Sequence, residues 1–62
     1  MQEKLRKDVK IARAVNEEWT YKEFAEVINI TPNSFYNWLN GYYELSEEKE
    51  RQLKDLIADL II

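Results

Sequence analysis

The chain has 62 residues, a net charge of −3, and neither cysteine nor histidine. This length allows one domain near the lower size limit for folding without cross-links. The absence of cysteine and histidine excludes disulfides and argues against the usual zinc sites, so we expect no metal and no cofactor. An acidic chain argues mildly against nucleic acid as a partner, because phosphate contacts need cations. The charge is uneven, however: residues 1–13 hold five bases against two acids, whereas residues 14–48 hold one base against seven glutamates.

Two observations bear on location. The first ten residues, MQEKLRKDVK, contain no apolar segment of the kind found in signal peptides. The apolar stretch at residues 56–62 is too short to cross a bilayer. We therefore expect a cytoplasmic protein that does not associate with membranes.

Residues 3–16 are expected to form the first helix, because apolar residues recur there at helical spacing. On the opposite side, three bases fall within a narrow arc at spacing i, i+4 and i+7: Arg6, Lys10 and Arg13. This basic stripe is open to two interpretations. It is either a solvated face that keeps the protein soluble or a set of phosphate contacts.

The second helix is expected at residues 21–28. Thr20 and Glu23 have the spacing of a capping box, in which each side chain bonds the backbone N–H of the other residue. Asn29 then interrupts the helix, because asparagine tolerates the left-handed conformation that a tight turn between helices requires.

The third helix begins after Thr31, a good N-cap, with Pro32 at its first position, where a missing N–H costs little. Asn40 and Gly41 end it. Its apolar side holds Phe35, Trp38 and Leu39. The other side is uncharged and polar, with residues at spacing i, i+3, i+4 and i+7: Asn33, Tyr36, Asn37 and Asn40. Lysine, glutamate and glutamine would stabilise a merely solvated helix face better, so we interpret this side as a recognition surface.

Ser46 is the expected N-cap of a fourth helix, in which Glu50 and Lys54 have the spacing of a stabilising ion pair. Five apolar residues line its inner side: Leu53, Leu56, Ile57, Leu60 and Ile61. The chain is thus expected to form one compact all-α domain, residues 1–62, of four helices, with a fifth left open. Its second and third helices form a helix-turn-helix.

Residues 19–46, WTYKEFAEVINITPNSFYNWLNGYYELS, resemble the lambda-repressor-like (Cro/XRE) helix-turn-helix family. Phe24-Ala25 stands where the family has Leu-Ala, Ile30-Thr31 matches its Val-Ser, and Asn40-Gly41 matches the Asn-Gly that ends its recognition helix. The chain departs from the family where Asn29 replaces the turn glycine, Tyr21 replaces a glutamine, and Pro32 occupies a position that often touches bases. The resemblance implies a sequence-specific DNA-binding transcriptional regulator, a repressor of the type encoded by phages and mobile elements.

The same resemblance implies two sets of DNA contacts. The base-reading residues would be Thr31, Asn33, Ser34, Tyr36, Asn37 and Asn40. The contacts to the DNA backbone would be Tyr21, Lys22 and Tyr43, with the stripe of Arg6, Lys10 and Arg13. Asparagine suits base reading because its amide presents a donor and an acceptor together to the edge of adenine.

Three glutamates directly follow the third helix and would repel phosphate: Glu44, Glu47 and Glu48. A homodimer that reads two half-sites would compensate for weak binding by each copy. The terminal residues Leu60, Ile61 and Ile62 are candidates for its interface. Packing of Leu60 within one chain is the alternative.

A protein-binding helix-turn-helix module, such as an antirepressor or inhibitor, is the rival function, since tyrosine, tryptophan and asparagine also suit protein interfaces. Bases that border the Asn/Tyr side would favour DNA, and bases on the far side would favour a protein. We do not expect an enzyme. Neither Glu17-Glu18 nor Glu47-Glu48 can form a general acid–base pair, because adjacent residues on a helix point apart.

Overall fold

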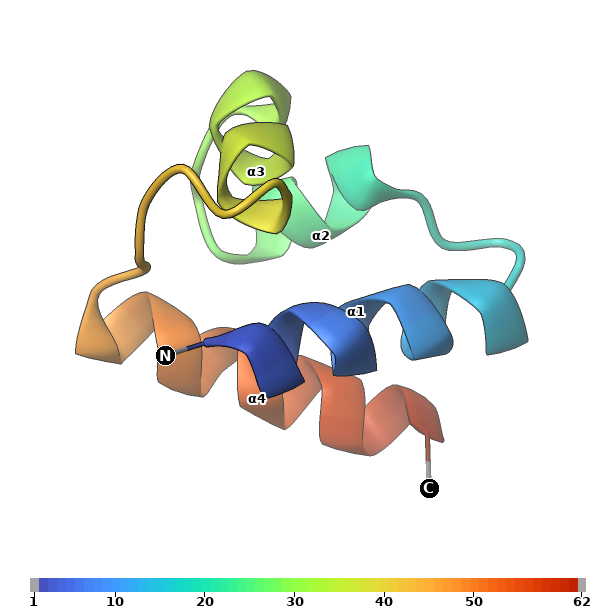
Figure 1. Ribbon diagram of the computed structural model, residues 1–62. Helices are drawn as coiled ribbons and strands as arrows, with labels where there is room; N and C mark the ends of the chain where they lie inside the picture. The colour runs from blue at the N-terminus through green and yellow to red at the C-terminus, as the bar shows by residue number, and fades with distance from the viewer. Residues whose placement is uncertain (1, 62) are drawn as a thin grey trace.

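The computed structural model describes residues 2–61, except for the side chain of Ile61. This part of the chain is all-helical and compact, with a radius of gyration of 10.4 Å, as the sequence predicts. The helices are α1 (Glu3–Val15), α2 (Tyr21–Val27), α3 (Pro32–Leu39) and α4 (Glu47–Ile61), shown in Figure 1. No helix within residues 2–61 combines the length and the apolar character needed to cross a membrane.

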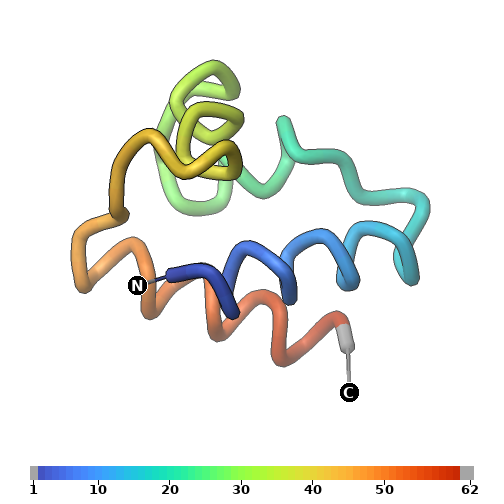
Figure 2. The backbone as a smooth tube through the Cα atoms, viewed as in Figure 1, coloured from blue at the N-terminus to red at the C-terminus, as the bar shows by residue number. Residues whose placement is uncertain are grey.

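The helices form two layers. α1 and α4 lie side by side and run in the same direction, while α2 and α3 cover one side of this pair (Figures 1 and 2). The Asn16 side chain joins the C-terminal ends of the first layer, because its amide donates to the Leu60 carbonyl at 3.1 Å. Leu60 also packs against the core of its own chain.

All four helices contribute to one core. Phe24, Phe35 and Trp38 are its largest fully buried side chains, and the Phe35 ring lies 6.2 Å from Phe24 and 5.6 Å from Trp38. Trp19 is half-buried and stacks on Phe24 at 5.4 Å. Aromatic side chains bury large apolar areas, so these rings contribute strongly to the stability of a domain of this size.

The turn between α2 and α3 follows the sequence prediction closely. Thr20 and Glu23 form the capping box that begins α2. Asn29 has a φ of 61°, the predicted left-handed conformation. The Ile30 N–H then bonds the Ala25 carbonyl at 3.0 Å. Thr31 caps α3 with Pro32 in its first turn, so α3 leaves the turn in a fixed direction.

The far end of this unit is held from α4. The Lys49 ammonium donates to the Ile28 carbonyl at 2.8 Å, where α2 ends. A cation at a helix C-terminus satisfies a carbonyl that lacks a helical partner and interacts favourably with the helix dipole. The first layer therefore supports the α2–α3 turn directly.

Candidate nucleic-acid interface

The outward face of α3 is uncharged and open to solvent. Asn33 and Asn40 are exposed, 47% of the Tyr36 surface is accessible, and Asn37 is half-buried. Because Phe35 and Trp38 are fully buried, the helix is sorted into an apolar and a polar side as predicted. The amide groups of the three asparagines thus lie along one face at helical spacing.

The hydroxyl groups at the start of α3 serve the cap. Thr31 Oγ1 accepts a bond from the Ser34 N–H at 3.1 Å and donates to Ser34 Oγ at 2.9 Å. The single hydroxyl hydrogen of Thr31 is thereby engaged, whereas the Ser34 hydroxyl acts as an acceptor in this bond and keeps its own hydrogen to donate. Of the two, Ser34 is the better candidate donor to a ligand, although its side chain is half-buried.

One edge of this face adjoins a basic side chain. The Tyr36 ring meets the Tyr21 ring edge-on at 5.9 Å. The Arg13 guanidinium lies 5.9 Å from the centre of the Tyr21 ring. Tyr21 also contacts Phe24 and Phe35, so it is anchored on the core and links α1 to the face of α3.

Arg6 does not belong to an exposed stripe, and this part of the prediction is wrong. Only 9% of its surface is accessible. Its Nε donates to the Trp38 carbonyl at 2.6 Å, and one terminal nitrogen donates at 2.9 Å both to the Tyr43 carbonyl and to the Glu44 carboxylate. The reason is the position of α1 beneath the C-terminal end of α3, where the negative end of the helix dipole attracts a cation.

The other candidate phosphate contacts differ in their exposure and in whether their donor groups are already used within the chain. Lys10 and Lys22 are exposed, and Lys22 lies in the first turn of α2. The Tyr43 hydroxyl donates to the Ser34 carbonyl at 2.9 Å, so its hydrogen is already used within the chain. Tyr42, by contrast, is 75% exposed. With Arg6 turned inward, the accessible bases among the predicted contacts are Lys10, Arg13 and Lys22.

Gln2 is a buried polar residue that the sequence pattern did not single out. Its Oε1 accepts from the Trp38 indole N–H at 2.7 Å and from the Leu45 N–H at 2.9 Å, and its Nε2 donates to the Leu45 carbonyl at 3.2 Å. Nothing in the spacing of a glutamine before a helix indicates such a role. A buried tryptophan needs an acceptor for its N–H, but the sequence does not say which residue supplies it.

Among the predicted dimer contacts, only Leu60 has a described side chain. Leu60 is half-buried against the core, which is the alternative that the sequence left open for it. The side chain of Ile61 and the whole of Ile62 lie outside the described residues.

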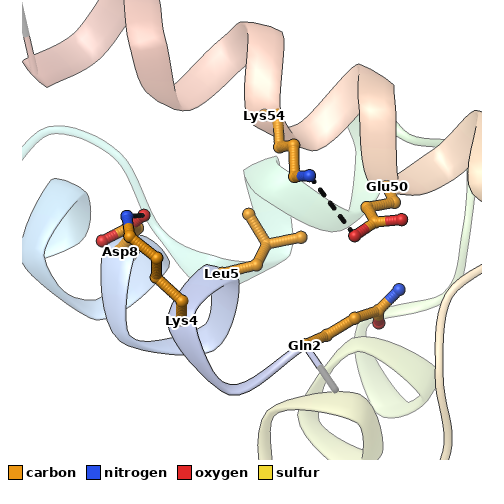
Figure 3. A pocket seen from close by; sticks show the side chains of 6 residues that line it. All are labelled: Gln2, Lys4, Leu5, Asp8, Glu50 and Lys54. Carbon is orange, nitrogen blue, oxygen red and sulfur yellow. Dashed lines mark hydrogen bonds and ion pairs between the residues drawn. The ribbon is translucent and has the colours of Figure 1, made fainter.

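A hollow of about 300 Å³ lies between the N-terminal halves of α1 and α4 (Figure 3). Its charged residues pair along each helix, with Lys4 3.0 Å from Asp8 and Lys54 3.5 Å from Glu50. Within residues 2–61, no group of three or more acidic side chains is arranged to hold a metal ion. The face of α3 is therefore the stronger candidate site.

Comparison with known proteins identified no relative of this chain. No protein-family model matches the chain, and neither the curated proteins nor the solved structures include a match.

Proposed function

We propose that this protein is a sequence-specific DNA-binding regulator with a lambda-repressor-like helix-turn-helix fold, and that α3 reads the major groove. The single observation that carries the proposal is the uncharged face of α3, on which Asn33, Asn37 and Asn40 lie in a row beside Tyr36. A helix that enters the major groove needs side chains of this kind, because base edges are read by donor–acceptor pairs rather than by charge.

The Arg13 side chain beside this face supports the proposal. It adjoins the Tyr21–Tyr36 pair, and Lys22 is an exposed base in the first turn of α2. Base contacts specify and phosphate contacts position, so bases belong beside the reading helix rather than on it. The Glu44 carboxylate, which would repel phosphate, is paired with Arg6 at 2.9 Å.

Three accessible bases give each copy modest affinity. Binding of two copies to two half-sites raises the affinity of the complex, and we propose a homodimer on DNA for this reason. Each neutralised phosphate contributes a slope of about −0.9 to the dependence of log K on log salt concentration. A copy that uses three bases should therefore show a slope of roughly −3.

The test is a salt-titrated binding measurement on duplex DNA taken from beside the gene, with a scrambled duplex of equal length as the control. We expect tighter binding to one segment of the natural duplex and a slope of roughly −3 for each bound copy, or twice that for a dimer on two half-sites. The Lys22→Ala variant should weaken binding to both duplexes alike and make the slope smaller in magnitude by about 1 for each bound copy. Absence of binding at low salt, or binding without salt dependence, would contradict the proposal.

A protein-binding function is the second candidate, and Tyr42 favours it. Its side chain is 75% exposed directly after α3, and tyrosines with large accessible surfaces are typical anchors of protein interfaces. The Tyr42→Ala variant separates the two functions. DNA recognition through α3 predicts that this change affects DNA affinity less than about threefold, whereas recognition of a protein predicts loss of the partner.

A further inference from the structure

Two polar side chains at the start of α1 hold the C-terminal end of α3. Arg6 and Gln2 together make six hydrogen bonds, two with Trp38 of α3 and four with residues 43–45 after it, and the Arg6 guanidinium also lies 5.2 Å from the centre of the Trp38 ring. The N-terminal end of α3 is held differently, by its Thr31 cap and by the bond from the Tyr43 hydroxyl to the Ser34 carbonyl. The two attachments meet at Tyr43, whose carbonyl accepts from Arg6 and whose hydroxyl donates to Ser34, but the hydrogen bonds of Arg6 and Gln2 to α3 itself are all at Trp38.

The attachment made by Arg6 and Gln2 is polar, and this indicates its role. Hydrogen bonds depend steeply on distance and angle, and fully satisfied buried polar networks make a structure rigid, so these bonds restrict the direction of the helix end. A buried ion pair is weak evidence for stability, since apolar residues of similar volume often do as well or better. A recognition helix, in contrast, must be held to within about 0.5 Å and 10–20° of its productive geometry.

We propose that Arg6 and Gln2 are positioning residues that determine sequence preference at the base pairs facing Asn37 and Asn40. This inference rests on the proposed DNA-binding function. It also says which part of the site they control. Because α3 is ~12 Å long and base pairs are stacked about 3.4 Å apart, the two ends of the helix face different base pairs. Loosening the C-terminal end displaces Asn40 and Asn37 most, because the Thr31 end, which carries Asn33, is joined to α2 by the turn in which the Ile30 N–H bonds the Ala25 carbonyl.

The experiment measures affinity for the preferred duplex and for a set of duplexes that each change one base pair of the half-site. The variants are Arg6→Met and Gln2→Met, which keep much of the side-chain volume and remove the hydrogen bonds. We expect each variant to lose at least about tenfold in discrimination at base pairs at one end of the half-site and less than about twofold at the other end. The salt slope should not change in Gln2→Met, which removes no charge; Arg6→Met also takes the Arg6 partner away from the Glu44 carboxylate, so its discrimination ratios rather than its absolute affinities carry the test.

Lys10→Met is the matched control for Arg6→Met, since it removes one positive charge from an exposed position of the same helix. It should weaken all duplexes alike and reduce the salt slope by about 1. If Arg6→Met behaves in this way, or if both Met variants lower the melting temperature without changing any discrimination ratio, the positioning role is wrong. If the unmodified protein shows no preference among duplexes, the proposed function fails instead.

Circular dichroism and tryptophan fluorescence report whether each variant is folded at the temperature of the binding measurement. Where Arg6→Met is unfolded, Arg6→Lys takes its place, because lysine keeps the charge but cannot form the same forked bonds. Loss of discrimination at one end supports the inference for either substitution, and unchanged discrimination in Gln2→Met together with Arg6→Lys overturns it.

Discussion

Asn29 occupies the most demanding backbone position of the α2–α3 turn. Its φ of 61° lies in the left-handed region, which costs a residue with a Cβ atom about 1–2 kcal/mol unless its side chain can compensate, as asparagine can. We expect Asn29→Ala to lower the free energy of unfolding by about 1 kcal/mol and Asn29→Gly to change it by less than about 0.5 kcal/mol. For a domain of this size, 1 kcal/mol corresponds to a fall of about 4–8 °C in melting temperature.

Thermal melting followed by circular dichroism checks this expectation. Asn33→Ala is the control, because it makes the same chemical change at an exposed position inside α3, where the conformation is helical. It should change the free energy of unfolding by less than about 0.5 kcal/mol. Equal effects of the alanine substitutions at both positions would show that the turn does not depend on the left-handed residue.

Local capping was predictable at the scale of residues because its causes are neighbours in sequence. Thr20 and Glu23, or Thr31 and Pro32, determine a helix start by contacts within four residues. Arg6 and Lys49 bond carbonyls 32 and 21 residues away, respectively, and no local pattern indicates such partners. The helical periodicity placed Arg6 on the basic side of the first helix, but it could not say which neighbouring helix would lie over that side.

At the scale of elements, α3 is the part of the molecule to which the proposed function assigns base reading. The Asn33→Ala, Asn37→Ala double variant removes two amide groups from its outward face and leaves Phe35 and Trp38 in the core. We expect its affinity for the preferred duplex to fall by about tenfold or more, while its affinity for a scrambled duplex changes less than about threefold.

The measurement is fluorescence anisotropy on both duplexes at one salt concentration, with Lys22→Ala alongside. The two variants should differ in kind, since a lost phosphate contact weakens every sequence equally. An equal loss on both duplexes for the double asparagine variant would contradict the assignment of base reading to α3.

The helix bounds were predictable to within about a residue, since the ends of α2 and α3 are marked by capping residues and α1 by a continuous apolar period. The arrangement of the helices in space was harder to predict from the sequence. The parallel course of α1 and α4 and the return of residues 41–46 to the start of α1 depend on long-range contacts, such as the burial of Leu45 against Gln2. The exposed face of α3 followed from periodicity alone, whereas its attachment to α1 did not.

For the whole molecule, the acidic start of α4 serves folding and opposes the proposed binding. Glu47 and Glu48 lie in its first turn, where negative charge interacts favourably with the helix dipole by about 0.3–1 kcal/mol each. The same carboxylates add to a net charge of −3 and follow α3 closely in the chain. The domain therefore gains helix stability from charges that repel phosphate at distances up to about a Debye length, ~10 Å at 0.1 M salt.

This conflict predicts the effect of removing the charges. The Glu47→Gln, Glu48→Gln variant changes the net charge from −3 to −1. We expect it to bind the preferred duplex about 3–10-fold more tightly at 0.05 M salt, with the gain nearly absent at 0.3 M, and to melt at a lower temperature. A titration of affinity against salt, made well below the melting temperature, measures the gain.

Asp55→Asn, Asp59→Asn is the matched control, because it makes the same change in net charge at exposed positions further along α4. Asp59 lies ~18 Å from Glu47 along the helix, beyond the screening length, so the control should show less than half of the gain. If the two variants gain equally, only the total charge matters and α3 need not face the DNA. If the glutamate variant binds DNA no better but loses a basic protein partner, the acidic flank belongs to a protein interface, and the second candidate function replaces the first.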